Sequence, residues 1–408
     1  MRQKQSYDKS SNCELNAPRA NGMSTVMQPA STEIAPEAAS SPSVAIASPF
    51  CWPEVRRGGE RMHAELTTHL AKDGFDVTFL SSAKRGEAKN AEIPEGVAHR
   101  VVLERRDLLR FRHHFTPAHE FRLRAPSYIR SIKCDTFYAL TYFDAAAFLA
   151  AHPRSPRPKL VTHSIGVPYR RVYRRVPWDG HMLARSIADA DRVYVLSTFA
   201  ADQTHKDYGR RPDVLPPPVN VGDFPAKETI PERPVILFSG DVNEPRKGAD
   251  LLVRAVNTFK DCDPELVFSG AITEAREAEL RGLSELPGER LSFLGTGRRE
   301  DLPALYRSAK ILVLPSQWEA FGLVLVEALA SGTPVVAARM GGGSDIVDRA
   351  EIGTLFDADS DEPVGALARA IRETLEKAST LSSISACRAR ALDFTWERLG
   401  PAYREALI

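Results

Sequence analysis

The chain has 408 residues, of which 43% are hydrophobic and 26% are charged, and its formal net charge is +1. This length exceeds one typical core, so we expect two domains, and the near-zero net charge argues against a nucleic-acid-binding protein. The five cysteines form no C-x-x-C pair, which argues against a disulfide framework and a zinc site, and no apolar run reaches the roughly 18 residues of a membrane span.

Residues 1–43 are predicted to be a disordered tail, because they are rich in Ser, Ala, Asn, Pro and Gln and show no apolar periodicity. They lack the apolar segment of a signal peptide, so we expect a cytoplasmic protein. Beyond the tail, residues 44–225 carry a positive net charge and residues 226–408 a negative one. This asymmetry predicts different partners for the two halves.

The first half begins with a strand–helix–strand pattern. A strand is expected at residues 43–50, a loop with Gly58 and Gly59 follows, a helix runs to about Ala71, and residues 75–82 form the next strand. A helix between two strands indicates a parallel sheet.

Two further strands are expected at residues 159–164 and 192–197, whereas residues 103–132 are basic and helical only in places. The segment at residues 215–225 contains four prolines, so we interpret it as the interdomain linker.

The second half repeats the pattern with short apolar strands separated by helical segments. These strands are expected at residues 234–240, 265–270, 290–295, 311–316 and 333–338. The sequence therefore predicts an α/β protein with two Rossmann-like, doubly wound parallel-sheet domains, residues 44–225 and 226–385. Ligands of such sheets bind beyond the carboxyl ends of the strands, so the site is expected in a central cleft that the two domains face.

One apolar segment, residues 321–329, contains a single charged residue, Glu327, and a second glutamate, Glu319, precedes it by eight positions. Burying an ionised carboxylate costs several kcal/mol unless hydrogen bonds replace its water. A helix that starts just after Glu319 would also present free N–H groups, which attract phosphates. We therefore expect Glu327 to accept hydrogen bonds from a ligand diol such as a ribose. The alternative is a solvent-exposed glutamate on an amphipathic helix.

Two adjacent cations, Arg246 and Lys247, precede Gly248 at the start of another predicted helix. Cations in a loop between a strand and a helix suit a diphosphate, since arginine contacts two oxygens and lysine acts as a point charge. The alternative is a solvated surface turn.

Three weaker signals lie at other strand ends. Gly58 and Gly59 would let the backbone approach a ligand closely. His163 ends a predicted strand and is expected to reach the cleft, although a structural hydrogen-bonding role is the alternative. Asp345, in the segment GGGSDIV, is available to ligand hydroxyls.

Other chemistries lack their motifs. No G-x-G-x-x-G follows a strand, which disfavours a nicotinamide dehydrogenase. The two D-x-D matches, Asp189 with Asp191 and Asp357 with Asp359, do not follow strands as a metal site would require. We predict that the protein needs neither a metal nor a cofactor.

The basic region combines six arginines with apolar residues, namely Arg105, Arg106, Arg110, Arg112, Arg122 and Arg124 with Leu108, Leu109, Phe111 and Phe115. This pattern is compatible with an interfacial helix on an anionic membrane, or with a site for a phosphorylated acceptor. A solvated basic surface is the alternative.

From about Ser43 to its C-terminus, the chain resembles the retaining, nucleotide-sugar-dependent glycosyltransferases of family 4, which have the GT-B fold. The resemblance is strongest over the PRKG segment and over residues 295–356, and it is looser at the Gly58-Gly59 loop and at the strand that ends in His163. Residues 386–408 resemble the family's last helix, which crosses back onto the N-terminal domain.

The resemblance implies donor-binding roles for the segment around the two glutamates. Glu319 would lie near the donor sugar, and the backbone N–H groups of Phe321, Gly322 and Leu323 would contact sugar hydroxyls and phosphate. Glu327 would bind the ribose hydroxyls of the nucleotide.

The resemblance also implies roles outside that segment. Lys247, with Arg246, would neutralise the diphosphate leaving group. The loop of Gly58 and Gly59 would let the first helix approach the phosphates or the acceptor, and His163 would lie beside the reacting sugar carbon.

Two positions depart from the family pattern. Asp241 follows Gly240 where the family usually has an arginine, so one expected diphosphate cation is missing. Asp345 replaces the family's usual glutamate in the G-G-x-x-E segment. The first departure keeps open a catalytically silent binding subunit with the same fold, and a sugar-nucleotide epimerase or hydrolase is the nearest alternative enzyme.

The reaction that the resemblance implies is the transfer of a hexosyl unit from a UDP- or GDP-linked donor to an acceptor hydroxyl with retained configuration. No protein nucleophile and no metal are expected. The acceptor would be a sugar, a lipid-linked molecule or a small molecule bound by the basic first domain, with peripheral contact to an anionic membrane as one option. Nucleic acid is not an expected partner.

Overall fold

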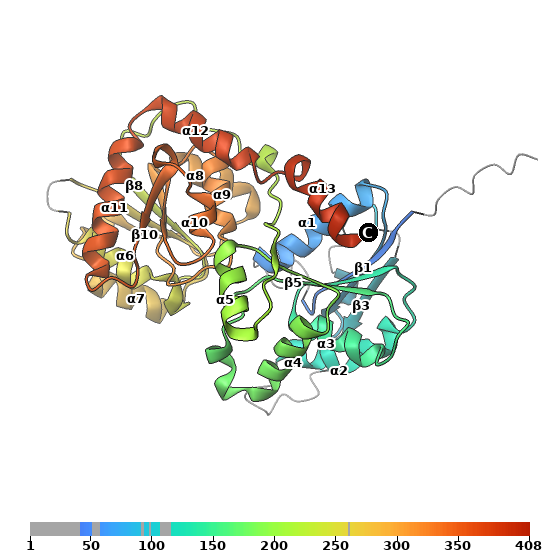
Figure 1. Ribbon diagram of the computed structural model, residues 1–408. Helices are drawn as coiled ribbons and strands as arrows, with labels where there is room; N and C mark the ends of the chain where they lie inside the picture. The colour runs from blue at the N-terminus through green and yellow to red at the C-terminus, as the bar shows by residue number, and fades with distance from the viewer. Residues whose placement is uncertain (1–40, 51–57, 91–93, 98, 107–115, 260–261) are drawn as a thin grey trace, which may run out of the picture. The chain divides into compact units, whose positions relative to one another are not determined.

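The computed structural model describes residues 41–50, 58–90, 94–97, 99–106, 116–259 and 262–408. From Ser41 to Ile408 these residues form one compact unit, which contains a seven-stranded and a six-stranded sheet (Figure 1). The predicted disordered tail lies almost entirely outside the described residues.

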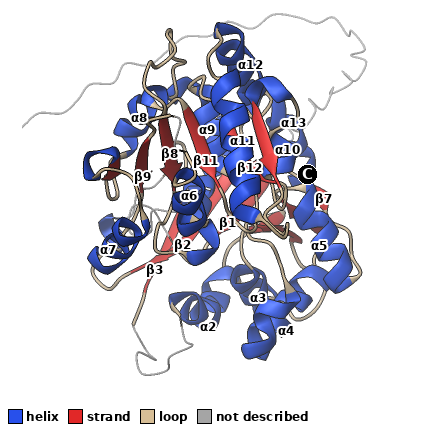
Figure 2. Ribbon diagram, turned by 90° about the vertical axis from the view of Figure 1, so that its left-hand side faces the viewer, coloured by secondary structure: helices blue, strands red, loops and turns tan. Residues whose placement is uncertain are grey.

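The first sheet is entirely parallel and has the strand order β3-β2-β1-β4-β5-β6-β7. Its strands are β1 (Ser43–Ala47), β2 (Asp76–Ala83), β3 (His99–Glu104), β4 (Thr136–Ala139), β5 (Lys159–Ser164), β6 (Arg192–Val195) and β7 (Asp213–Val214). The helices are α1 (Gly58–Lys72), α2 (Pro117–Ile129), α3 (Tyr142–Ala151), α4 (Pro177–Ala188) and α5 (Thr198–Tyr208). Helices α2, α3 and α4 lie beside one another in both views of the molecule (Figures 1 and 2).

The second sheet is also parallel and has the order β10-β9-β8-β11-β12-β13. Its strands are β8 (Val235–Ser239), β9 (Glu265–Ser269), β10 (Leu291–Phe293), β11 (Ile311–Leu314), β12 (Val335–Ala338) and β13 (Gly353–Phe356). The helices are α6 (Ala249–Val256), α7 (Glu274–Leu283), α8 (Leu302–Ser308), α9 (Leu323–Ala330), α10 (Gly343–Ile346), α11 (Pro363–Lys377) and α12 (Leu381–Leu392).

The predicted fold class, two Rossmann-like parallel-sheet domains, is confirmed. In both sheets the strand order reverses beside the first strand, between β1 and β4 and between β8 and β11. Such a reversal separates two neighbouring loops, and the space between them is the usual ligand site of an open α/β sheet. The PRKG segment and residues 316–322, which contain Glu319, follow β8 and β11, so this topology places them next to each other.

The last two helices belong to different sheets. In α12, Ser383 Oγ donates a hydrogen bond of 2.8 Å to the Glu351 carbonyl, within the second half of the chain. Helix α13 (Trp396–Leu407) lies against the first sheet instead, because Thr136 Oγ1 donates to the Leu407 carbonyl at 2.7 Å. The chain therefore returns to the first sheet at Trp396, ten residues later than the predicted boundary at residue 386.

The two sheets share a core. One cluster of buried apolar side chains includes Val44 of the first sheet, Leu237 of the second and Phe321 at the start of α9. The rings of Phe224, from the predicted linker, and Tyr306, from α8, lie 5.9 Å apart inside it. The apolar side chains of the predicted linker are thus packed into the shared core, whereas Asn220, Gly222, Asp223 and Pro225 are exposed.

Candidate functional site

The loop after β8 packs closely against the loop after β11 and is hydrogen-bonded to it. Gly248 has a φ of +76°, and a Cβ atom there would lie 2.4 Å from the carbonyl oxygen of Pro315. The backbone N–H of Gln317 also donates to the Arg246 carbonyl at 2.8 Å. Only glycine combines this backbone conformation with so close an approach, which explains why PRKG ends in glycine.

The predicted cations and Glu319 lie together in these two loops. Lys247 Nζ donates a hydrogen bond to Glu319 Oε2, and Arg246 Nη1 lies 3.8 Å from the same oxygen. Arg246 also donates to the Trp318 carbonyl at 3.1 Å, and its guanidinium lies 4.5 Å from the centre of the Trp318 ring. The carboxylate of Glu319 therefore holds both cations in fixed positions at the carboxyl edge of the second sheet.

The glycine-rich loop after β12 completes this group of loops. Gly341 pairs with Glu319 as an isolated β-bridge, and the Gly342 N–H donates to the Glu319 carbonyl at 3.0 Å. A Cβ atom at Gly342 would lie 2.3 Å from the Cα atom of Phe321. The glycines therefore allow three loops, from the neighbouring strands β8, β11 and β12, to meet around Glu319.

The starts of α1 and α9 face each other. Gly322 precedes α9 with a φ of +102°, and a Cβ atom at Gly58, the first residue of α1, would lie 3.1 Å from Leu323 Cδ1. A Cβ atom at Gly59 would lie 2.4 Å from Ile165 Cδ1, in the loop after β5. Helix starts carry unpaired N–H groups and a partial positive charge, so this position favours an anion.

Glu327 is buried, with 1% of its surface exposed, and its carboxylate accepts hydrogen bonds from the protein itself. Arg61 Nη1, from α1, donates to Glu327 Oε1, and Tyr306 Oη donates to Oε2 at 2.8 Å. Burial and the charge of Glu327 raise the pKa of Tyr306, so the phenol stays protonated and remains a donor. The alternative of a solvent-exposed glutamate is therefore wrong, and the predicted contact with a ligand diol stays a prediction.

Arg61 and Tyr306 are the site residues that the sequence analysis missed. Burial alone would lower the pKa of Arg61, but the charges of Glu327 and Glu65 outweigh it and raise the pKa of the guanidinium. Arg61 Nε donates to Glu65 Oε1 at 2.9 Å, and Arg299 contacts the same oxygen at 2.7 Å. One signal for Arg61 was available, since it lies three positions after Gly58 and therefore on the same face of α1.

His163 does not reach the predicted cleft. Its side chain is fully buried, Tyr138 Oη contacts Nδ1, and the rings of Tyr194 and Tyr403 lie 6.1 Å away. Burial lowers the pKa of His163 to about 3, so the imidazole is neutral. The expectation of a cleft-facing catalytic histidine is corrected to a buried position in β5, packed against Tyr138 of β4 and Tyr403 of α13.

The two residues that depart from the family pattern both accept hydrogen bonds from other residues of the protein. Asp241 Oδ1 accepts hydrogen bonds from the backbone N–H and the side-chain amide of Asn243, at 3.0 and 3.1 Å. Asp241 therefore stabilises the turn after β8, and it does not supply the positive charge that an arginine at this position would offer to a diphosphate. Asp345 Oδ2, in the short helix α10, accepts from the Thr198 N–H at 2.6 Å, which joins α10 to the start of α5.

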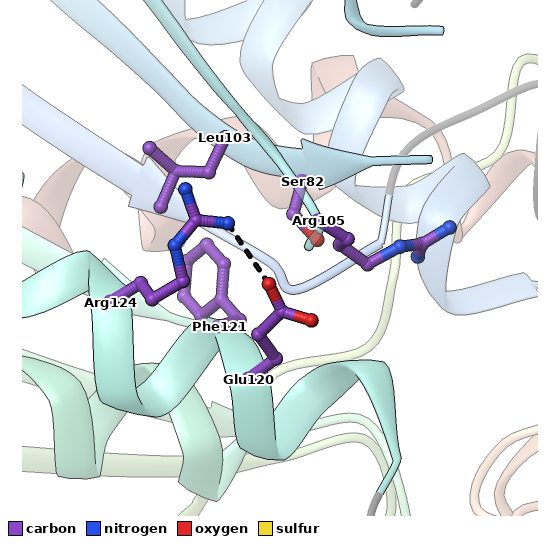
Figure 3. A pocket seen from close by; sticks show the side chains of 6 residues that line it. All are labelled: Ser82, Leu103, Arg105, Glu120, Phe121 and Arg124. Carbon is purple, nitrogen blue, oxygen red and sulfur yellow. Dashed lines mark hydrogen bonds and ion pairs between the residues drawn. The ribbon is translucent and has the colours of Figure 1, made fainter. Parts of the chain in front are cut away.

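The basic region is not one interfacial helix. Strand β3 ends at Glu104 and α2 begins at Pro117, while residues 107–115, with Arg110 and Arg112, lie outside the described residues. Arg105 is 4% exposed and lines a small pocket with Arg124 and Glu120, which point toward one another (Figure 3). Arg124 Nη1 donates to Glu120 Oε1 at 2.9 Å, so part of the predicted positive charge is neutralised.

The described residues contain no group of three or more His, Cys, Asp or Glu side chains that could hold a metal ion. The predicted metal independence stays a prediction. Among the described helices, none combines the length and the apolar character that a bilayer crossing requires.

Two family models match the chain. Residues 56–223 match the model described as Glycosyltransferase Family 4, and residues 221–387 match the model described as Glycosyl transferases group 1. The chain is 32% identical over 245 residues to D-inositol 3-phosphate glycosyltransferase of Acidothermus cellulolyticus, with 54% of each chain covered. It is 34% identical over 250 residues to the protein of the same name from Saccharomonospora viridis, with 54% of this chain and 57% of that protein covered. The chain thus spans about half the length of the curated relatives it matches.

Solved structures share the fold across most of the chain. Sucrose-phosphate synthase from Thermosynechococcus elongatus superposes with a TM-score of 0.73 at 21% identity, covering 90% of this chain and 98% of that chain. Anabaena HepE in complex with UDP and glucose superposes with a TM-score of 0.68 at 18% identity, covering 90% and 99%. The first half of the chain thus contains a Glycosyltransferase Family 4 domain and the second half a Glycosyl transferases group 1 domain, and together they have the GT-B fold of these solved structures.

Proposed function

We propose that the protein transfers a hexosyl unit from a nucleoside-diphosphate sugar to an acceptor hydroxyl with retention of configuration. The observation that carries the proposal is the meeting of three loops around Glu319, which fixes Lys247 and Arg246 beside the start of α9. Two cations and a helix start at one sheet edge form a site for a diphosphate. HepE, which shares the fold, was solved with UDP and glucose and with UDP-glucose, which supports a donor of this class.

In the proposed reaction the diphosphate is the leaving group. The acceptor oxygen forms its bond to the anomeric carbon on the face from which the diphosphate departs, and the acceptor proton passes to a diphosphate oxygen. Lys247, Arg246 and the N–H groups at the start of α9 stabilise the charge that develops on the diphosphate. In the structure Lys247 is bound by Glu319, and in the proposed complex it also binds the diphosphate. The diphosphate therefore replaces part of the contact between Lys247 and Glu319, and this frees Glu319 to contact the donor.

Glu327 keeps its proposed role at the ribose, with Arg61 and Tyr306 as the groups that orient it. A carboxylate accepts about four hydrogen bonds, and these two donors use only part of that capacity. The relatives named D-inositol 3-phosphate glycosyltransferase suggest an acceptor that is a polyol or its phosphate, bound by the first domain.

The test is a panel of UDP- and GDP-linked sugars with inositol, inositol 3-phosphate and simple sugars as acceptors, followed by product analysis. Transfer that depends on both donor and acceptor is expected. Release of free nucleoside diphosphate without any acceptor product would support the hydrolase reading, and a lack of binding to every nucleotide would support a silent binding subunit.

A further inference from the structure

A basic and apolar surface segment follows β5, outside the group of loops around Glu319. The 3₁₀ helix η2 (Arg170–Arg175) contains four arginines, all exposed, and the chain then enters α4. Val172 and Trp178 of the same stretch are 52% and 64% exposed. We call residues 170–178 the Arg170–Trp178 patch.

A buried and a half-buried tyrosine fix the orientation of the patch. Tyr169, just before η2, is 4% exposed, and the Tyr173 ring packs edge-on against Tyr142 at 5.6 Å. A 3₁₀ helix has three residues per turn, so side chains three positions apart point the same way. Arg170 lies in the row of Tyr173, which is turned inward, whereas Val172 and Arg175 share one outward row and Arg171 and Arg174 share the other.

The positive charge of the patch is not neutralised locally. Within the part of the chain that the structure describes, none of the four arginines makes an ion pair. The one acid of the stretch, Asp179, is 7% exposed and points inward, where it accepts a hydrogen bond from Tyr142 at 3.1 Å and lies 2.9 Å from His119 Nε2. Arg170 has one carboxylate nearby, because its backbone N–H donates to Asp207 Oδ2 at 2.8 Å. Arg174 and Arg175 are exposed and make no ion pair with the described residues.

The apolar residues decide between two kinds of anionic partner. A phosphorylated soluble acceptor would be bound by the arginines and would leave an exposed tryptophan without a role. At a membrane surface, tryptophan lies at the level of the headgroups, and each arginine strengthens binding to anionic lipid by about fivefold. An exposed Trp178 beside four arginines fits the membrane better.

The patch is also close to the candidate site. The ring of Tyr169 packs edge-on against Trp318 at 5.3 Å, and Trp318 immediately precedes Glu319. A surface on which the patch rests would therefore lie beside the loop that holds the two cations.

We propose that the Arg170–Trp178 patch docks the first domain on an anionic membrane surface, so that the site faces hydroxyl groups carried by membrane lipids. The interaction needs no donor nucleotide, so it stands apart from the proposed transfer reaction. It also replaces the interfacial helix that the sequence suggested for the arginines between Arg105 and Arg124.

Vesicle flotation of the full-length protein tests the proposal. We expect wild-type protein to float with vesicles that contain equal amounts of phosphatidylcholine and phosphatidylglycerol, and not with phosphatidylcholine alone. The double variant R174E/R175E should bind at least about tenfold more weakly, and W178A should lower the bound fraction. High salt should release the wild type, because it screens the attraction.

The matched control is K133E/R154E, which makes the same change in charge at two exposed residues that precede β4 and β5, on the opposite edge of the sheet. Melting temperatures establish that each variant is folded. The proposal is overturned if the wild type does not bind the anionic vesicles, or if the control loses binding as strongly as R174E/R175E. Binding of soluble inositol phosphate at the patch without any vesicle binding would also overturn it.

Discussion

Replacing Arg61 by methionine should strongly destabilise the protein. The substitution leaves Glu327 buried with the hydrogen bond from Tyr306 but without its cation, since the side chain of Glu327 is 2% exposed and that of Arg61 is 11% exposed. Removing one partner of a buried ion pair costs about 3–5 kcal/mol. The hydrogen bond from Tyr306 remains, so we expect the lower end of that range, about 3 kcal/mol.

A double-mutant cycle isolates the contribution of the contact itself. Urea unfolding of Arg61→Met, Glu327→Gln and the double variant should give a coupling free energy of about 2 kcal/mol, because the double variant no longer buries an unpaired charge. The exposed pair Arg185–Asp189 is the matched control, with side chains 57% and 34% exposed, and its cycle should give at most about 0.5 kcal/mol. Equal coupling in the two cycles would refute the idea that Arg61 satisfies the carboxylate of Glu327.

Three further predictions address the packing around the site. Gly248→Ala should lose about 1–3 kcal/mol, because its Cβ would lie 2.4 Å from the Pro315 carbonyl; thermal unfolding measures this, and Gly297→Ala, with nothing within 4 Å, should show no comparable loss. Asp345→Ala removes the acceptor for the first N–H of α5 and should cost about 1 kcal/mol in the same assay, whereas an unchanged melting temperature would count against the contact. His163 has a pKa near 6.5 in the unfolded chain, whereas burial lowers it to about 3 in the folded chain. Between these pH values the unfolded state therefore binds more protons than the folded state. The free energy of unfolding consequently falls as the pH falls. Urea unfolding measures the free energy of unfolding at pH 7 and pH 5. Between these values His163→Asn should lose about 2 kcal/mol less stability than the wild type. An equal loss in the two proteins would contradict the buried neutral imidazole.

Much of the fold could be predicted from sequence, because most strands are short apolar runs that end at glycine, serine or proline. The segments PVILFSG and ILVLPS contain β8 and β11, and their order along the chain already implied parallel pairing. Strand β4 was missed because only four residues, TFYA, form it, and β3 was missed because it opens the basic region. Their pairing with neighbouring strands, rather than any local pattern, makes them strands.

Site residues that follow the strands could be predicted from sequence. Contacts between residues far apart in the sequence could not. Lys247 and Glu319 were both predicted in loops that follow strands of one sheet, and in the structure Lys247 donates a hydrogen bond to Glu319 there. Arg61 and Glu327 are 266 positions apart and lie on helices α1 and α9, which pack on different sheets, so no local pattern could pair them. His163 was misplaced because successive side chains of a strand point to opposite faces, and its position near the strand end does not fix which face it occupies.

The most direct test of the proposed donor site is a calorimetric titration of UDP and GDP into the wild-type protein and into Lys247→Met. The exposed residue Lys206, in α5, provides the control variant Lys206→Met. We expect one nucleotide to bind to the wild type and to the control with equal affinity, and to bind at least about tenfold more weakly to Lys247→Met, since a charged hydrogen bond to phosphate is lost. Equal affinity of Lys247→Met and the wild type would contradict the assignment of the diphosphate to the PRKG loop.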